Sequence, residues 1–230
     1  MPRSLRCPIV TIDGPSGSGK GTISRAVAQH VGWHLLDSGA LYRLVALAGV
    51  AAGVASEDAP RHAELAARME VAFGSAPDGG ERVWLDGRDV TGEIRSETAG
   101  QGASRVAAWP AVRAALLERQ RAFARPPGLV ADGRDMGTVV FPQADLKIFL
   151  TATLEERTLR RHKQLKDKGS DVSLPALSRE IAERDLRDQT RQVAPLRPAP
   201  DACVIDSTGL EVGAVVGRVL ELMAARRLWR

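Results

Sequence analysis

The fold of this 230-residue chain is decided near its start, by the run Ile9-Val10-Thr11-Ile12-Asp13-Gly14-Pro15-Ser16-Gly17-Ser18-Gly19-Lys20-Gly21-Thr22. Residues 8–12 are apolar and rich in β-branched side chains, which predicts a short buried parallel strand. From Lys20 to Val31 the apolar residues recur at helical spacing, until Gly32 ends the pattern. A strand, a glycine-rich loop and a helix in this order are the context that a phosphate-binding P-loop requires.

The composition of the loop suits a triphosphate. Its glycines permit a tight turn in which successive backbone N–H groups converge on one anion. Lys20 adds a mobile positive charge for the transferred phosphate, and the N-terminus of the helix adds its dipole. We therefore expect ATP to bind the loop residues Gly14, Pro15, Ser16, Gly17, Ser18, Gly19, Lys20, Gly21 and Thr22.

The end of the loop departs from the general P-loop pattern. Gly21 occupies the position at which a hydroxyl residue usually holds magnesium, and Thr22 follows it. The metal candidates are Thr22 and Asp132, because P-loop enzymes keep a carboxylate near Mg²⁺ at the end of a buried strand. Asp37 also follows a predicted strand and is a further candidate. The sequence leaves open whether the metal is held directly or through water.

Strand-like and helical segments alternate along most of the chain. Further strands are predicted at residues 34–36, 129–131, 146–150 and 203–205. Helices are predicted at 38–53 with Ser38 as N-cap, at 58–70, at 96–124 with a break at Pro110, at 153–168, at 174–190 and at the C-terminus. This alternation predicts an α/β fold of the P-loop NTPase type, a three-layer α/β/α arrangement with a parallel sheet.

Residues 71–90 depart from this alternation of strands and helices. Residues 71–73, 82–85 and 89–90 are short strand-like runs, and the pairs Gly79-Gly80 and Asp86-Gly87 are turn signals between them. We therefore expect a small antiparallel β insert within the α/β domain.

The composition excludes several classes of protein. The chain is 44% hydrophobic and 26% charged, which is typical of a single globular domain and excludes a disordered or fibrous one. No apolar run approaches a membrane span and no signal segment follows residues 1–7, so we expect a cytoplasmic protein. The net charge of +4 suits an anionic partner, but aromatic residues make up only 4% of the chain, which argues against nucleic acid.

Three further runs follow the P-loop in order: Leu35-Leu36-Asp37-Ser38-Gly39-Ala40-Leu41-Tyr42-Arg43, Ala131-Asp132-Gly133-Arg134-Asp135-Met136-Gly137-Thr138 and Glu183-Arg184-Asp185-Leu186-Arg187-Asp188-Gln189-Thr190-Arg191. With the P-loop they resemble the bacterial cytidylate kinase family, and the resemblance extends over nearly the whole chain. It implies a monomeric enzyme that uses ATP and Mg²⁺ to convert CMP or dCMP into CDP or dCDP, without nucleic-acid or membrane partners.

The resemblance also implies roles for individual residues. The acceptor phosphate would be held by Arg43, Arg134 and Arg191, whose guanidinium forks suit a phosphate dianion. Asp135 would accept a hydrogen bond from the exocyclic amine of cytosine, where uracil presents an acceptor instead. The other substrate contacts would be Ser104 and Arg113 at the base, Arg184 and Asp188 at the ribose, and Ser38 and Tyr42 along the acceptor pocket. Tyr42 is as well suited to the core, and Asp135 and Asp188 to ion pairs or helix caps.

The basic helix predicted at 153–168 corresponds to the lid of the family, a helical element in which Arg157 and Arg161 would contact ATP. Closing such a lid brings positive charge over the triphosphate and excludes water. The resemblance implies one nucleoside monophosphate kinase domain. Its core would comprise 1–64, 105–152 and 192–230, its CMP-binding insert about 65–104, and its lid with the following helices about 153–191.

These expectations combine into in-line transfer of the γ-phosphoryl group of ATP to a phosphate oxygen of CMP, without a covalent enzyme intermediate. Catalysis would come from positioning two anions and from stabilising charge with Lys20, Arg134 and Arg191. Two alternatives stay open at this stage. One is a P-loop kinase for another acceptor such as UMP or AMP, and the other is a nucleotide-switched RNA-binding module or GTPase, although the guanine-recognition run Asn-Lys-x-Asp is missing.

Overall fold

The computed structural model describes residues 7–75, 81–167, 169 and 172–229. They divide into two compact units. The first comprises the described residues up to Asp37 and from Gln120 onward, and the second comprises Ser38–Arg119. The division into core, insert and lid that the sequence suggests stays a prediction.

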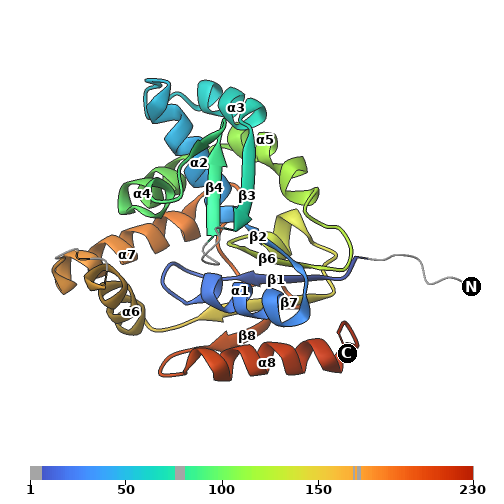
Figure 1. The fold of residues 1–230 in the computed structure, drawn as a ribbon. Coiled ribbons are helices and arrows are strands. Elements are labelled where there is room, and N and C mark those ends of the chain that lie inside the picture. The colour runs from blue at the N-terminus through green and yellow to red at the C-terminus, as the bar shows by residue number, and fades with distance from the viewer. Residues whose placement is uncertain (1–6, 76–80, 168, 170–171, 230) are drawn as a thin grey trace, which may run out of the picture. The chain divides into compact units, whose positions relative to one another are not determined.

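The first unit is built on a five-stranded parallel sheet in the order β2-β6-β1-β7-β8 (Figure 1). The strands are β1 (Ile9–Asp13), β2 (His34–Asp37), β6 (Leu129–Gly133), β7 (Leu146–Thr151) and β8 (Cys203–Asp206). The central strand β1 pairs with β6 on one side and with β7 on the other. Because both of its edges are paired, the loop that follows β1 starts from a fixed point in the middle of the sheet.

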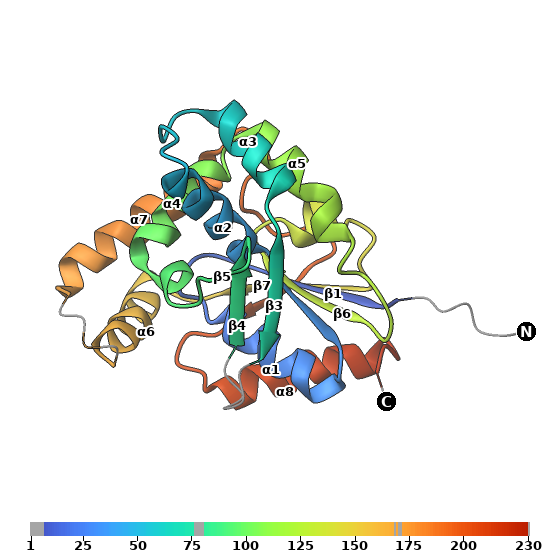
Figure 2. The same cartoon turned by 45° about the horizontal axis from the view of Figure 1, so that its top comes forward.

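Two helices cover one face of this sheet, α1 (Lys20–Val31) and α8 (Val212–Ala225), which lie side by side in both views (Figures 1 and 2). The spacing of Ile23, Val27 and Ala28 turns one apolar stripe of α1 towards the strands. Fully burying each large aliphatic side chain of this kind contributes about 1.5–3 kcal/mol. The core consists of Val10, Ile12, Ile23, Val27, Ala28, Val130, Leu146, Ile148, Leu150, Val215, Val219 and Met223.

The rest of the first unit supplies polar elements. After β6 the chain forms a short π-helix, η2 (Met136–Val140), which packs against β1 and β6. After β7 come two helices that pack against each other, α6 (Leu154–Lys166) and α7 (Leu174–Thr190). Thr153 caps α6 by accepting a hydrogen bond from the backbone N–H of Glu156.

The second unit combines helices with a three-stranded antiparallel sheet (Figure 2). Its elements are α2 (Ser38–Ala51), α3 (Ala59–Arg68), β3 (Val71–Ser75), β4 (Glu81–Leu85), β5 (Arg88–Asp89), the 3₁₀ turn η1 (Glu93–Arg95), α4 (Glu97–Val106) and α5 (Pro110–Arg121), which belongs to this unit as far as Arg119. A Cβ added at Gly102 on α4 would lie 2.9 Å from the Cβ of Ala46 on α2. The two helices therefore approach closely at this glycine.

The fold class expected from the sequence is confirmed: the chain is a P-loop NTPase-type three-layer α/β protein with a parallel sheet and a small antiparallel insert. The break at Pro110 is also confirmed, since α5 begins there. The prediction that Ser38 caps α2 from outside is wrong. Strand β2 ends at Asp37 and passes directly into the helix, so that Ser38 is its first residue. The predicted Gly79-Gly80 turn lies outside the described residues.

In the part of the chain that the structure describes, no helix combines the length and apolar character needed to cross a bilayer.

A glycine in α2 provides a test of the packing in the second unit. A Cβ at Gly49 would lie 2.2 Å from Nε2 of His62, which is buried and held through Nδ1 by the carbonyl oxygen of Asp58. We predict that Gly49→Ala lowers the free energy of unfolding by about 1–3 kcal/mol, because the overlap outweighs the better helix propensity of alanine. Urea unfolding monitored by circular dichroism measures the change.

The matched control is Gly217→Ala on α8. Among the described residues, no atom outside this helix lies within 4 Å of a Cβ at Gly217. We expect this change to be neutral or to stabilise the protein by up to about 1 kcal/mol. A Gly49→Ala protein as stable as the wild type would contradict the close contact between Gly49 of α2 and His62.

Candidate active site

The P-loop joins the end of β1 to the start of α1. Gly17 and Gly19 have φ angles of 76° and 89°, in the left-handed region that favours glycine. Alternation of left-handed residues with others turns successive N–H groups to one side of the loop and forms an anion-binding nest. Lys20 lies at the first position of α1, and its Nζ donates a hydrogen bond of 3.0 Å to the carbonyl oxygen of Pro15.

Opposing effects act on the pKa of Lys20. Burial and, to a lesser extent, the nearby guanidinium of Arg134 lower the pKa of its ammonium group to about 7, although Asp132 opposes the shift. A polyanion beside Nζ would restore the charged form. The residue is therefore poised to gain a proton when phosphate binds.

Asp13, the last residue of β1, connects the P-loop to the segment that follows β6. Its two carboxylate oxygens accept hydrogen bonds from the backbone N–H groups of Met136 and Gly137, each 2.8 Å long. Burial raises the pKa of Asp13 to about 7 in spite of these two donors. These bonds fix the start of η2 and so the position of the preceding Asp135.

The predicted acceptor-site residues of the first unit form a network of arginines and carboxylates. Arg134 Nε lies 3.0 Å from Oδ2 of Asp188, and Arg191 Nη2 lies 4.0 Å from Oδ1 of Asp135. Burial raises the pKa of Asp188, but Arg134, with Arg184 and Arg191, outweighs this effect and holds the pKa below its ordinary value. Both ion pairs are largely buried, which holds the guanidinium forks in fixed directions.

The space beside Gly21 fits a magnesium ion bound with nucleotide. A Cβ at Gly21 would lie 3.1 Å from Oδ2 of Asp132, so the missing side chain leaves room next to this carboxylate. Mg²⁺ is commonly held by one or two carboxylates together with substrate phosphates, which matches this donor set. The side chain of Thr22 is exposed. The metal contacts expected of Thr22 and Asp37 stay predictions.

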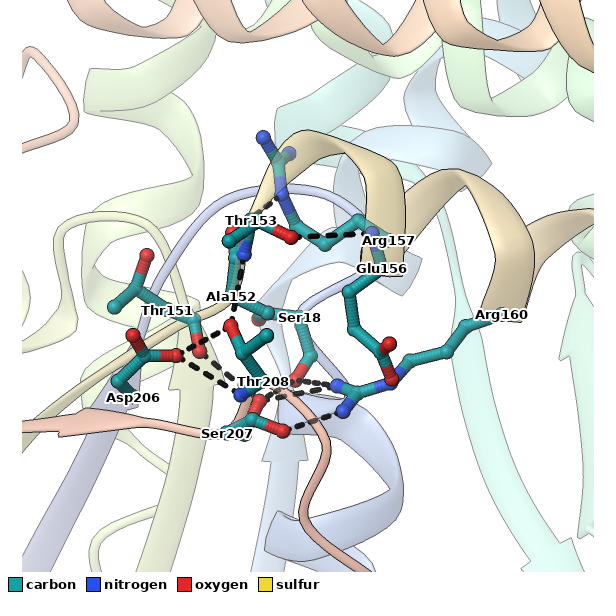
Figure 3. Close-up of polar contacts among 10 residues, drawn as sticks. All are labelled: Ser18, Thr151, Ala152, Thr153, Glu156, Arg157, Arg160, Asp206, Ser207 and Thr208. Carbon is teal, nitrogen blue, oxygen red and sulfur yellow. Dashed lines mark hydrogen bonds and ion pairs between the residues drawn. The ribbon is translucent and has the colours of Figure 1, made fainter.

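The two arginines of α6 that are predicted to contact ATP have different surroundings. Arg157 is buried and donates from Nε to the carbonyl oxygen of Ala152 and from Nη1 to the carbonyl oxygen of Ser16 and to Asp185 (Figure 3 shows the Ala152 bond). Arg161 donates to Gln164 on the exposed side of the same helix. The buried arginine thus contacts the P-loop backbone, and the ATP contacts expected of both residues remain predictions.

The remaining predicted substrate residues all lie in the second unit. Arg43 donates from Nη1 to the carbonyl oxygen of Ile94 at 3.0 Å, and Arg113 donates from Nη1 to that of Ala107 at 3.2 Å. The guanidinium of Arg113 also lies over the ring of Tyr42, 5.7 Å from its centroid. Ser38, Tyr42, Ser104 and Arg113 are buried. Tyr42 is therefore part of the packing of α2 and is paired with a predicted base-contacting arginine.

Sequence reasoning missed several residues of the site, namely Asp13, Arg160, Asp185 and Ser207. Asp13 had one visible signal, since it ends the first strand immediately before the P-loop. Asp185 lies within the run 183–191, but its partner Arg157 is 28 residues away. The contacts of Ser207 with Ser18 span 189 residues and leave no mark in the local sequence.

Comparison with known proteins gives a consistent picture. The model of the cytidylate kinase family matches residues 10–225. The cytidylate kinase of Shewanella denitrificans is 57% identical over 223 residues, which cover 96% of this chain and 98% of that protein. The cytidylate kinase of Methylococcus capsulatus is 58% identical over 91% of this chain and 93% of its own length. That of Pseudomonas paraeruginosa is 58% identical over 93% of each chain.

The lowered pKa of Lys20 predicts proton uptake on ADP binding. With a pKa of about 7 in the free protein, Lys20 is mostly neutral at pH 8, and the diphosphate should favour its charged form. We expect uptake of up to one proton at pH 8. Titration calorimetry in two buffers of different ionisation enthalpy measures the number of protons.

The control is Lys20→Met, in which this uptake should disappear even if binding is weaker. Binding of ADP to the wild-type protein at pH 8 without any proton uptake would contradict the assignment.

Proposed function

The chain belongs to the cytidylate kinase family, and we propose that it transfers the γ-phosphoryl group of ATP to CMP or dCMP, giving ADP and CDP or dCDP. The observation that carries this proposal is the family match, which spans residues 10–225 and so both structural units. The network of Lys20, Arg134 and Arg191 supports it, because a kinase with a monophosphate acceptor must hold two polyanions side by side.

The proposed mechanism relies on positioning and charge. The N–H groups of the P-loop and Lys20 hold the β- and γ-phosphates, while Arg43, Arg134 and Arg191 hold the phosphate of CMP. In-line attack by a CMP phosphate oxygen forms the new P–O bond as the bond to the ADP oxygen breaks. The positive side chains stabilise charge on the moving phosphoryl group, and no enzyme nucleophile is needed.

Selection of cytosine is assigned to Asp135. A carboxylate accepts a hydrogen bond from the exocyclic amine of cytosine but repels the carbonyl oxygen that uracil carries at that position. Asp13 supports this role by fixing the two residues that follow Asp135. Ser104 and Arg113 are proposed to complete the base contacts, Arg184 and Asp188 to contact the ribose, and Ser38 and Tyr42 to contact the acceptor.

Mg²⁺ is proposed to bind with ATP beside Asp132, with Thr22 as a further ligand directly or through water. When bound, the ion neutralises charge on the phosphates and orients them for transfer. The space at Gly21 supports an ion that shares its ligands between the protein and the nucleotide. A cytoplasmic monomer, without nucleic-acid or membrane partners, remains the expectation from the sequence.

The experiment that tests the function is ADP release with ATP and one acceptor at a time. We predict rapid turnover with CMP and dCMP. We expect UMP to be a poorer acceptor by one to two orders of magnitude, because one mismatched hydrogen-bonding group costs about 1–3 kcal/mol. AMP should be inactive. Equal rates with and without any pyrimidine monophosphate would refute the proposal, and a preference for UMP or AMP would identify another monophosphate kinase.

The role of Arg191 is tested by Arg191→Lys. This variant keeps a positive charge beside Asp135 but loses the two-pronged contact with phosphate. We predict a fall in kcat of about 10²–10³-fold, the range seen when one transition-state donor is removed. The unfolding temperature should change by only a few degrees, and the exposed Arg218→Lys should change neither quantity. Normal kinetics in Arg191→Lys would remove this residue from the mechanism.

A further inference from the structure

Two arginines of α6 hold alternate carbonyl groups of the P-loop. Arg157 Nη1 donates to the carbonyl oxygen of Ser16 at 3.0 Å, and Arg160 Nη1 donates to that of Ser18 at 3.3 Å. The two arginines lie three residues apart on the helix, and therefore face the same side. The N-terminal half of α6 is thus bound to the backbone of the loop itself.

The guanidinium of Arg160 is held from three sides (Figure 3). Nε donates to Glu156 at 2.8 Å, one turn earlier in α6. Nη1 donates to Oγ of Ser207 at 3.0 Å, and Nη2 donates to the carbonyl oxygen of the same residue at 2.5 Å. Because these contacts leave the guanidinium little freedom, its bond to Ser18 has a fixed direction.

Ser207 is the second support of the same carbonyl group. The residue is buried directly after β8, and its backbone N–H donates to the carbonyl oxygen of Thr151 at the end of β7. Its hydroxyl lies 3.2 Å from the carbonyl oxygen of Ser18 and 2.9 Å from that of Thr151, and can donate its proton to either. The Ser18 carbonyl therefore accepts a hydrogen bond from α6 and lies within reach of a second donor at the end of β8.

These bonds determine where an N–H group of the cradle points. In a trans peptide the carbonyl group of one residue and the N–H group of the next point in opposite directions. Holding the Ser18 carbonyl towards Arg160 and Ser207 turns the N–H of Gly19 away from them. Gly19 has a φ of 89°, and because glycine adopts positive and negative φ angles about equally readily, contacts with its neighbours are needed to fix this conformation.

We propose that Arg160, together with Ser207, is a positioning residue for the P-loop, which sets the direction of the Gly19 N–H group towards the phosphates of the nucleotide. This inference rests on the proposed function only in taking the P-loop as the ATP site. Arg160 acts through the backbone of Ser18 and does not contact the phosphate. Its loss should weaken binding of any ligand with two or more linked phosphates, and should leave CMP unaffected.

The test compares Arg160→Met and Ser207→Ala with the wild type. Arg160→Met keeps the aliphatic part of the side chain and removes its donors, whereas Ser207→Ala removes a hydroxyl without changing any charge. Calorimetry would measure the dissociation constants for ADP, for inorganic tripolyphosphate, which has no base or ribose, and for CMP. Arg218→Met is the matched control, because it removes one positive charge from an exposed position on α8.

We expect Arg160→Met to weaken ADP and tripolyphosphate by about 10- to 100-fold and Ser207→Ala by about 3- to 10-fold, from the usual strength of charged and neutral hydrogen bonds. CMP affinity should be unchanged in both variants, and Arg218→Met should match the wild type. In steady-state assays the KM for ATP should rise while the KM for CMP and the kcat at saturating ATP stay within about threefold, as expected when only binding energy is lost.

Two results would overturn the proposal. Wild-type affinity of Arg160→Met for both phosphate ligands would mean that the contact is only structural. Weak binding by Arg160→Met with unchanged binding by Ser207→Ala would mean that Arg160 touches the phosphate directly. If Arg160→Met does not fold, as judged by circular dichroism, Ser207→Ala alone decides. These titrations need no CMP-dependent turnover, so failure of the proposed function would be recognised separately by the acceptor assay.

Discussion

A backbone that points several N–H groups at one anion must turn the intervening carbonyl groups away, and each of those carbonyls then needs a donor of its own. In this protein most of these donors come from outside the loop. Arg157 donates a hydrogen bond to the carbonyl oxygen of Ser16, and Arg160 and Ser207 are the donors beside that of Ser18. Lys20 donates to the carbonyl oxygen of Pro15. The same contacts tie the loop to α6 and to the ends of β7 and β8, so that the anion site and the packing of the first unit depend on each other.

The parallel sheet places the other charges of the first unit. Because β1 and β6 are neighbours and run in the same direction, Asp13 and Asp132 lie close to each other at the carboxyl ends of their strands. Asp13 then holds the start of η2, and the arginines and carboxylates on either side pair with one another. Ion pairs offset part of the cost of burying Asp135 and Asp188, whereas the shifted pKa values of Asp13 and Lys20 show that burial outweighs the contacts of these two groups.

Much of this structure could be predicted from the sequence, because its main signals are local. The strand, loop and helix around residues 9–31 have a clear apolar period and a glycine-rich motif, and the structure has them at the predicted places. The π-helix after Asp135 could not be predicted, because a buried carboxylate more than 120 residues earlier holds it. The contacts of α6 with the P-loop could not be predicted either. Arg157 and Arg160 donate to the carbonyl oxygens of Ser16 and Ser18, and helical periodicity does not reveal bonds between such distant residues.

The long sequence separation of these contacts has a consequence for synthesis of the chain. The P-loop is translated before its partners, because the donors for its Ser18 carbonyl follow 142 and 189 residues later. At the usual 5–20 residues per second, roughly 10–40 s separate the translation of Ser18 from that of Ser207. During this interval the nascent chain carries the complete P-loop motif but lacks the partners that hold its carbonyl groups. The bonds from Arg160 and Ser207 to the Ser18 carbonyl can therefore form only after β8 and the following Ser207 have been translated.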